Sequence, residues 1–335
     1  MQGLQRVAID PTGAIRLGGS IVVDGHDPEA VARVITHIHT DHIRRIRESA
    51  LELNALVATP LTLDLLAARG IRVPEHKRVG LDYYATFSVA GDSIRLLRAN
   101  HVPGAAEVLV ETVDGLSLGY TGDFKLPGTD IMRDLDVLVI DATYGDVRYR
   151  RPWQDQAELI LVETVDRMLS LSPVGIYAYN GKVEEVMILL REYGIDAPYI
   201  LSSTLYRSAR VLEKYGFKLG YYVDERSDEA SELMRGGPYI RLLPFGKLRS
   251  SNGLPGNEIK IILSGWEFSA PVRRLGENEI LVSFSDHADF DQLVEYVQEA
   301  RPRLLVVDSS RGGAAAYKFS RYVRDYLGIE SLAMP

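Results

Sequence analysis

Three of the seven histidines in this 335-residue chain lie within six residues, in the run THIHTDH (residues 36–42). Residues 31–35 before them are largely apolar and predict a buried strand. On an extended chain the side chains of His37 and His39 point the same way, so both imidazoles can meet one ion. Asp41 and His42 follow as the chain leaves the strand and can face a second ion. Neutral imidazole and carboxylate suit zinc, manganese and similar divalent ions, so this segment predicts a metal site.

Two later strand ends supply further candidate ligands. A strand over residues 94–97 leads into a loop with the sequence HVPGA, which carries His101, and a strand over residues 116–120 ends in TGD, which carries Asp123. Alone, His101 would be an ordinary surface residue and Asp123 a cap of the next turn. Beside the histidine cluster, both are expected to converge on the first pair of imidazoles, and the two oxygens of Asp123 can bridge two ions.

In order and rough spacing, HIHTDH, HVPG and TGD resemble the motifs of the metallo-β-lactamase fold. The resemblance implies that one ion is held by His37, His39, His101 and Asp123. It implies that a second is held by Asp41, His42 and the bridging Asp123. We expect two divalent ions, Zn²⁺ in the first place, with Mn²⁺ or Mg²⁺ as alternatives at the second site. Asp24 matches the family's first motif, which implies that it orients ligand histidines, as metal-bound imidazoles generally require.

Two motifs in the second half narrow the resemblance. Asp141 ends an apolar strand over residues 136–140, and His287 lies in SFSDHAD. The pair is similar to motifs A and B of the β-CASP nucleases, which implies a place at the scissile phosphate, with Thr143 and Ser285 beside it. A carboxylate next to an imidazole raises the pKa of that imidazole and keeps it protonated near neutrality. The alternative is that the acidic residues around His287 only begin the helix that starts near residue 288.

The next motif departs from the RNA-directed β-CASP members, which carry a VHG sequence after the following strand. Here the strand over residues 304–307 ends in Asp308 and SSRGG, without a histidine. The DNA-directed branch, which contains Artemis, also lacks this histidine, and the 145 residues between Asp141 and His287 suit its shorter insertion. Asp308 has two open roles, as a ligand of the second ion or as a cap of the glycine-rich turn. If no group fills the gap, the second ion is held weakly.

The order of the expected elements predicts an α/β protein, a four-layer αββα metallo-β-lactamase sandwich with an inserted α/β β-CASP cap. Residues 1–148 and 265–335 would form the sandwich, with a strand near residue 281 in its second part. Residues 149–264 would form the cap, where alternating strands and helices predict a small parallel sheet.

The expected cap contains candidate substrate-binding residues. Asn180, Gly181 and Lys182 lie between a strand and a helix, where backbone N–H groups and a lysine bind phosphate well. The DNA-directed branch has a similar turn, which implies a 5′-phosphate pocket; a plain helix start with a surface lysine is the alternative. Ser264 and Trp266 follow a later strand, and Trp266 would either stack on a base or be buried.

The composition limits the classes of function. The absence of cysteine excludes disulfides, cysteine-ligated zinc and thiol catalysis. A net charge of −8 argues against a general nucleic-acid coat and leaves room for a local basic cleft. Without an 18-residue apolar run or a signal pattern, we expect a cytoplasmic protein and no membrane partner.

These features together predict a metal-dependent nuclease that hydrolyses phosphodiester bonds. We expect a 5′–3′ exonuclease on single-stranded DNA in DNA repair or processing, with RNA as a further substrate; an open cleft would instead make it an endonuclease. The alternatives are a β-CASP RNase in RNA maturation or decay, a small-molecule metallo-hydrolase and an inactive binding subunit.

Overall fold

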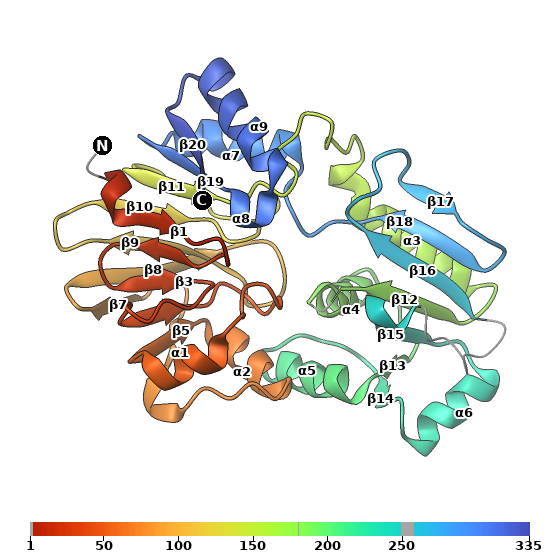
Figure 1. Ribbon diagram of the computed structural model, residues 1–335. Helices are drawn as coiled ribbons and strands as arrows, with labels where there is room; N and C mark the ends of the chain where they lie inside the picture. The colour runs from red at the N-terminus through yellow and green to blue at the C-terminus, as the bar shows by residue number, and fades with distance from the viewer. Residues whose placement is uncertain (1–2, 180, 249–257) are drawn as a thin grey trace. The chain divides into compact units, whose positions relative to one another are not determined.

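The computed structural model describes residues 3–179, 181–248 and 258–335, so the prediction for Asn180 lies outside the described residues. The chain forms two compact units, each described by itself (Figure 1). Unit 1 comprises Met1–Ala67, Ile71–Arg150 and Asp286–Pro335. Unit 2 comprises Ala68–Gly70 and Arg151–Ser285. The mixed α/β class expected from the sequence is confirmed.

Unit 1 contains two sheets. The first has the order β1 (Val7–Ile9), β2 (Ile15–Leu17), β3 (Ile21–Val23), β4 (Ala32–Val34), β5 (Ala55–Ala58) and β6 (Arg78–Gly80). The second has the order β20 (Ser331–Met334), β19 (Leu305–Asp308), β11 (Val137–Ile140), β10 (Ser117–Tyr120), β9 (Ala106–Glu111), β8 (Asp92–Arg98) and β7 (Thr86–Val89). Both sheets are mixed: strands β3 to β6 pair in parallel, and so do β10, β11, β19 and β20.

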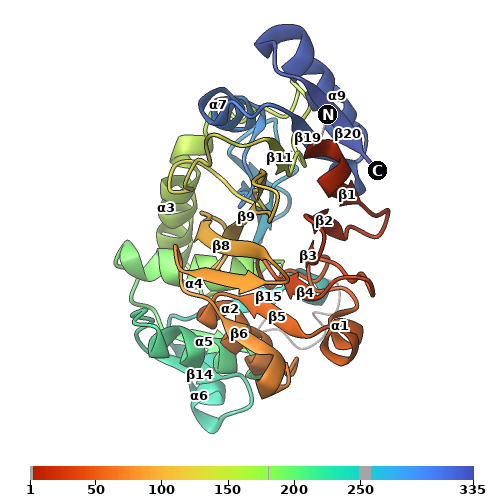
Figure 2. The same cartoon turned by 90° about the vertical axis from the view of Figure 1, so that its left-hand side faces the viewer.

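The alternation of side chains along β11 explains how unit 1 is layered. Val137 and Val139 belong to the core that also includes residues of β2, so the two sheets pack face to face. Leu138 and Ile140 point the other way, into a second core with helices α7 (Phe290–Ala300) and α9 (Ala314–Tyr322). These helices lie beside β11 and β19 (Figure 2). Because β11 is buried on both faces, its sequence is a continuous apolar run.

The remaining helices of unit 1 are short. They are α1 (Ile46–Glu52), α2 (Pro60–Ala68, whose last residue falls in unit 2) and α8 (Ser309–Gly312). Val22 of β3 packs against Leu53, which follows α1, on the face of the first sheet that is turned away from the central core.

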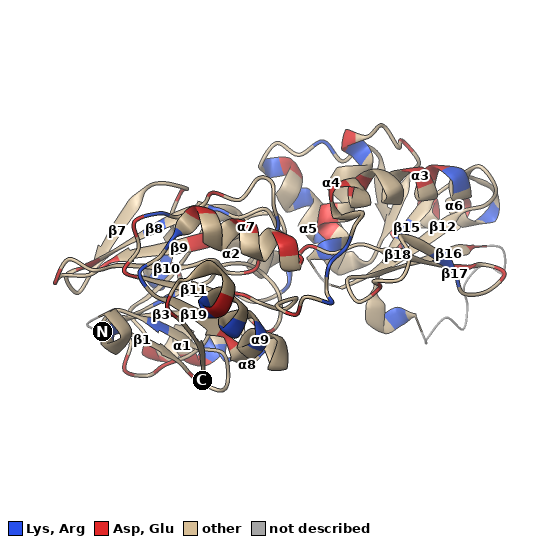
Figure 3. Cartoon of the chain, turned by 90° about the horizontal axis from the view of Figure 1, so that it is seen from above, with Lys and Arg blue, Asp and Glu red and all other residues tan. Residues whose placement is uncertain are grey.

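Unit 2 is a largely parallel α/β domain. Its sheet has the order β14 (Tyr222–Asp224), β13 (Tyr199–Leu201), β15 (Ile240–Pro244), β12 (Val174–Ala178), β16 (Ile259–Ser264), β18 (Glu279–Ser283) and β17 (Val272–Arg274). Only the edge strand β17 pairs antiparallel. The helices are α3 (Ala157–Leu169), α4 (Lys182–Glu192), α5 (Ser203–Lys214) and α6 (Asp228–Gly236). Helices α3 and α6 carry residues of both charges (Figure 3).

The chain returns to unit 1 at Asp286, later in the sequence than the predicted boundary at residue 265. Strand β18 pairs in parallel with β16 along its whole length, from Lys260 with Glu279 to Ser264 with Ser283, so it extends the sheet of unit 2. The strand near residue 281 is therefore not part of the second half of the first domain, and unit 1 resumes at Asp286. Within the described residues, no helix is long and apolar enough to cross a membrane.

Candidate metal centre

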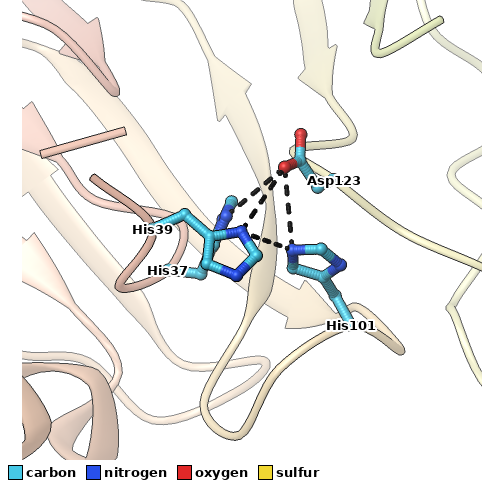
Figure 4. Close-up of side chains that lie close together, drawn as sticks. All are labelled: His37, His39, His101 and Asp123. Carbon is cyan, nitrogen blue, oxygen red and sulfur yellow. Dashed lines mark hydrogen bonds and ion pairs between the residues drawn. The ribbon is translucent and has the colours of Figure 1, made fainter. Parts of the chain in front are cut away.

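The candidate ligands of unit 1 follow the ends of strands from both of its sheets. His37, His39 and His42 lie in the segment between β4 and α1, His101 follows β8, and Asp123 follows β10. The side chains of His37, His39, His101 and Asp123 point toward one another (Figure 4). All four are buried except His39, which is partly exposed. The fold thus brings together residues separated by up to 86 positions in the chain.

The distances in this cluster match a tetrahedral metal site. Asp123 Oδ2 lies 3.4 Å from His37 Nε2, 3.6 Å from His101 Nε2 and 4.0 Å from His39 Nδ1. His39 Nδ1 and His101 Nε2 are 3.1 Å apart. Four ligands at the usual zinc–nitrogen and zinc–oxygen distances lie about 3.4 Å from one another on a tetrahedron. Three imidazoles and one carboxylate therefore fit a zinc ion in number, chemistry and spacing.

Unsatisfied atoms in the cluster point to the same conclusion. His37 Nε2, His42 Nε2 and Asp123 Oδ1 are buried and have no hydrogen-bond partner. Polar atoms buried without a partner cost free energy, which a bound cation would offset. Burial lowers the pKa of His101 to about 3 and lowers the pKa of His37 well below its usual value, so both imidazoles are neutral, the form that binds metal.

Hydrogen bonds to the other ring nitrogens fix which atom of His101 and of His37 faces the cluster. His101 Nδ1 donates to the carbonyl oxygen of Asp286 at 2.7 Å, which leaves Nε2 with its lone pair. His37 Nδ1 lies 2.9 Å from the Thr36 hydroxyl, which itself donates to Asp24 Oδ2. The hydroxyl must therefore accept from His37, and Nε2 of His37 is again the free ligand atom. The Asp286 carbonyl and Thr36 were not predicted from the sequence.

Asp24 is buried next to this cluster. It is linked to His37 through Thr36 and contacts His42 directly. Its Oδ2 accepts a hydrogen bond from His42 Nδ1 at 2.7 Å, and its Oδ1 accepts from the backbone N–H of Thr36 at 2.8 Å. Asp24 has a φ of 53°, a left-handed conformation uncommon for non-glycine residues, so the fold holds this carboxylate in place at some cost in backbone strain. This geometry is that of a residue that orients ligand histidines.

The second predicted set is looser than the first. His42 Nε2 lies 3.2 Å from Asp123 Oδ2 and 3.3 Å from Asp41 Oδ2. The side chain of Asp41 is 43% exposed. Among the described residues, four groups of His, Asp or Glu are close enough to hold an ion, and neither Asp41 nor Asp308 belongs to any of them.

Asp308 has the hydrogen bonds of a cap, one of its two predicted roles. Its Oδ1 accepts from the backbone N–H and the hydroxyl of Ser310 at 2.8 and 2.5 Å. Its Oδ2 accepts from Arg311 Nη1 at 2.8 Å. Both oxygens are thus engaged at the start of α8. Arg311 lies beside the second set of candidate ligands, with Nε 3.8 Å from Asp41 Oδ2. It was not predicted, because arginine is not a usual metal ligand.

Asp141 and His287 form a pair next to the metal cluster. His287 Nδ1 donates to Asp141 Oδ2 at 3.1 Å, and His287 Nε2 lies 3.8 Å from Asp123 Oδ2. Burial alone would lower the pKa of His287, but the charge of Asp123 and the hydrogen bond to Asp141 outweigh it and raise this pKa to about 10. The hydrogen bond to Asp141 therefore favours the protonated form of His287.

Thr143 positions the carboxylate of Asp141. It donates to Asp141 Oδ1 through its backbone N–H at 3.0 Å and through its hydroxyl at 2.8 Å. Asp289 caps α7 by accepting from the N–H groups of Asp291 and Gln292, while the side chain of His287 faces the cluster. The helix-capping alternative therefore applies to Asp289 and not to His287.

A pocket of about 330 Å³ opens beside these groups within unit 1. Its lining combines the candidate ligands and the Asp141–His287 neighbourhood with basic and hydroxyl side chains: Thr12, Gly13, His39, Asp41, Arg44, Asp123, Thr143, His287, Ser310 and Arg311. Arg44, Thr12 and Ser310 were not predicted, because isolated arginines and hydroxyls in loops carry no sequence signal of their own. Positive charge and hydroxyl donors suit a phosphate group.

The predicted substrate-binding residues of the cap all lie in unit 2. Gly181, with a φ of 95°, precedes α4 and donates its N–H to Glu184 Oε2 at 3.0 Å. Lys182 is buried, with Nζ 3.5 Å from the Phe284 carbonyl oxygen, so it is not the surface lysine of the alternative. Ser264 accepts from the N–H of Trp266, whose side chain is exposed rather than buried in a core. Ser285 is buried at the end of unit 2.

The chain is similar to several known proteins. It is 41% identical over 140 residues to an uncharacterised protein in the lig 3′ region of Acidianus ambivalens, covering 41% of this chain and 99% of that one. It is 23% identical to the probable RNase MJ4 of Methanocaldococcus jannaschii, over 67% of this chain and 62% of that protein. It is 25% identical to the 5′ exonuclease Apollo of Gallus gallus, over 90% of this chain and 63% of that protein.

The chain thus spans less than two thirds of the length of these last two relatives. A solved structure from Enterococcus faecalis, of a protein of unknown function, is similar in fold with a TM-score of 0.60 and 17% identity, over 84% of this chain and 76% of that one. No family model matches the chain.

Proposed function

The chain belongs to the β-CASP family of metallo-β-lactamase-fold proteins, and from that premise we propose that it is a metal-dependent nuclease. The observation that carries the proposal is the convergence of His37, His39, His101 and Asp123, with the Asp141–His287 pair beside them. We propose that unit 1 is the four-layer αββα sandwich and that unit 2 is the inserted cap. A cytoplasmic location stays a prediction.

Single-stranded DNA, degraded from its 5′ end in repair or processing, is the proposed substrate. The absence of a histidine after β19 supports this choice, and so does the similarity to a protein named a 5′ exonuclease. The second candidate is an RNase of RNA maturation or decay, favoured by the similarity to a probable RNase.

We propose two places for divalent ions. Zn²⁺ would be held by His37, His39, His101 and Asp123, and a second ion, Zn²⁺, Mn²⁺ or Mg²⁺, would be held by Asp41, His42 and Asp123. Bound ions would supply Lewis acidity to the phosphate and to the attacking water.

Besides binding the ions, the chain would contribute a proton donor, His287, to the cleavage of the phosphodiester bond. His287 Nδ1 donates to Asp141 Oδ2, and Thr143 fixes Asp141 from the other side, so the second ring nitrogen, Nε2, faces the cluster in one orientation. Nε2–H can pass its proton to the departing oxygen of the phosphodiester, which is general-acid catalysis. The carboxylate of Asp141, which accepts from Nδ1, favours the protonated form of the imidazole.

In unit 2, Gly181 and Lys182 are proposed to receive a 5′-phosphate, together with Asn180. The exposed ring of Trp266 supports a role in stacking on a base, with Ser264 and Ser285 as further contacts. These assignments do not depend on the metal cluster. If they are wrong, the proposal for the metal centre still stands.

The test compares labelled single-stranded DNA and RNA, each with and without a 5′-phosphate, incubated with the zinc-loaded protein. We expect DNA with a 5′-phosphate to be shortened from that end, releasing mononucleotides. His42→Ala is the control, because activity that survives this change would come from a contaminating nuclease. Preferential cleavage of RNA would favour the second candidate, and two intact polymers would reject both.

A further inference from the structure

Arg311 is held in one orientation by three separate segments of unit 1. Its Nη1 donates to Asp308 Oδ2 at 2.8 Å, and its Nη2 donates to the carbonyl oxygens of Gly13 at 2.9 Å and Asp24 at 3.2 Å. Its side chain is only 9% exposed. A guanidinium bonded on two sides cannot swing away into solvent, so its charge is a fixed feature of this site.

The third donor of Arg311 faces the candidate metal centre. Its Nε is buried and has no hydrogen-bond partner, and it lies 3.8 Å from Asp41 Oδ2. Arg311, Asp41 and Asp123 line the same pocket. The positive charge of Arg311 therefore sits beside the carboxylate that would contribute to the second ion, at a distance where charges interact strongly in a partly buried site.

Two consequences follow for a second ion. Asp308 follows strand β19, but both of its oxygens already accept hydrogen bonds from Ser310 and Arg311, and it belongs to none of the groups of described residues that could hold an ion. Asp41 is already partly neutralised by Arg311, and a divalent cation placed beside it would be repelled by the guanidinium.

We propose that Arg311 is a resident cation at the second-ion position, so that the chain retains one divalent ion tightly and a second only weakly. The inference deepens the proposed function, since it rests on the site being a metal centre. Arg311 supplies from the chain itself part of the positive charge that a second ion would bring to a phosphate. The arginine thereby takes the place of a ligand residue after β19.

The experiment measures zinc retention by the full chain, without any nucleic acid. Protein stripped with a chelator is reloaded with excess Zn²⁺, passed over a desalting column and analysed by elemental mass spectrometry. We expect the unmodified chain to retain about one zinc ion. Arg311→Gln, which keeps hydrogen-bonding groups and removes the charge, should bind the second ion about tenfold more tightly or better in a zinc titration.

Two variants separate charge from structure. Arg311→Lys keeps the positive charge and should leave the second ion weak, whereas a purely structural role would make the Lys and Gln variants alike. Arg44→Ala removes a different positive charge from the lining of the same pocket and should not change zinc retention. Circular dichroism confirms that each variant is folded, and if Arg311→Gln does not fold, the comparison of Arg311→Lys with Arg311→Met decides.

Several outcomes would overturn the inference. Retention of two zinc ions by the unmodified chain would do so, as would equal second-ion affinity in the Gln, Lys and unmodified proteins. A chain that retains no zinc would reject the inference and the proposed function together. A chain that retains one zinc ion but cleaves neither DNA nor RNA would reject the proposed nuclease activity alone and leave the assignment of Arg311 supported.

Discussion

At the scale of single residues, the ligand set follows from residue type and spacing, whereas the groups that orient it do not. His37, His39, His101 and Asp123 are predictable because imidazoles and carboxylates at strand ends have few other uses in such a pattern. The orienting role of the Asp286 carbonyl oxygen has no sequence signature, because every residue has a carbonyl. Thr36 and Arg311 were missed because neither residue type is a usual zinc ligand, and their roles arise only from contacts with Asp24 and Asp308.

The contact between Thr36 and His37 gives a prediction about metal affinity. Thr36→Val keeps the shape of the side chain but removes the hydroxyl that accepts from His37 Nδ1 and donates to Asp24. Loss of such an orienting contact typically weakens metal binding about 10- to 100-fold. A zinc competition titration against a chromophoric chelator measures the change, and Thr36→Ser, which keeps the hydroxyl, is the matched control. Equal zinc affinity in the Val and Ser variants would contradict this role.

A second residue-scale prediction concerns His287. Replacing it with glutamine removes the protonated group that faces the cluster, and the rate of cleavage should fall about 10²- to 10⁴-fold, the usual range for a lost general acid. Zinc content should not change, because the four ligands of the first ion remain. Steady-state kinetics on the preferred polymer, with zinc measured on the same samples, provides the test. A parallel loss of zinc would instead make His287 a metal ligand.

At the scale of elements, periodicity predicts that a strand exists but not which sheet it joins. The strand near residue 281 was expected in the first domain, yet β18 pairs with β16 in unit 2. Pairing depends on contacts between residues that are far apart in the chain, and an apolar run has the same appearance in either sheet. The helices and strands from β12 to α5 were easier to predict, since their alternation with turns repeats locally.

Strand β9 and helix α7 are joined by a buried polar contact that predicts a pH dependence of stability. Tyr296 donates to Glu107 Oε1 at 2.6 Å, and Oε2 has no partner. Burial raises the pKa of the Glu107 carboxyl well above its usual 4.5, against the smaller opposing effect of this hydrogen bond. The folded chain thus binds this proton more tightly than the unfolded chain, so its contribution to stability is full below pH 4.5 and is lost as the pH rises toward the folded-state pKa.

Glu107→Gln tests this link. The amide keeps an acceptor for Tyr296 and cannot ionise, so the variant should be more stable than the unmodified protein at pH 8 by about 1 to 3 kcal/mol. Near pH 4.5 the two proteins should have similar free energies of unfolding. Urea denaturation at both pH values gives the comparison. A stability difference that is the same at both values would show that ionisation of Glu107 is not its cause.

At the scale of the whole molecule, the two units differ in what a metal ion can do for them. The four ligands of the first ion all lie in unit 1, whereas both tryptophans, Trp153 and Trp266, lie in unit 2. An ion that binds only the folded state stabilises it by about 2.7 kcal/mol at one hundred times its dissociation constant. That stabilisation applies to the unit that contains the ligands, because unfolding of unit 2 alone leaves the ligands in place.

Removal of the metal should therefore act unequally on the two units. With a chelator, the thermal transition of unit 1 should shift to lower temperature, visible in the far-ultraviolet circular dichroism to which both units contribute. The transition detected by tryptophan fluorescence reports on unit 2 and should shift less. Re-addition of Zn²⁺ should restore the first transition, and an Asp123→Asn variant should show little response to either treatment, since it lacks the carboxylate that contacts all three imidazoles. Equal shifts of both signals on chelation would mean that the units unfold as one cooperative body, and no shift in either would contradict the metal centre.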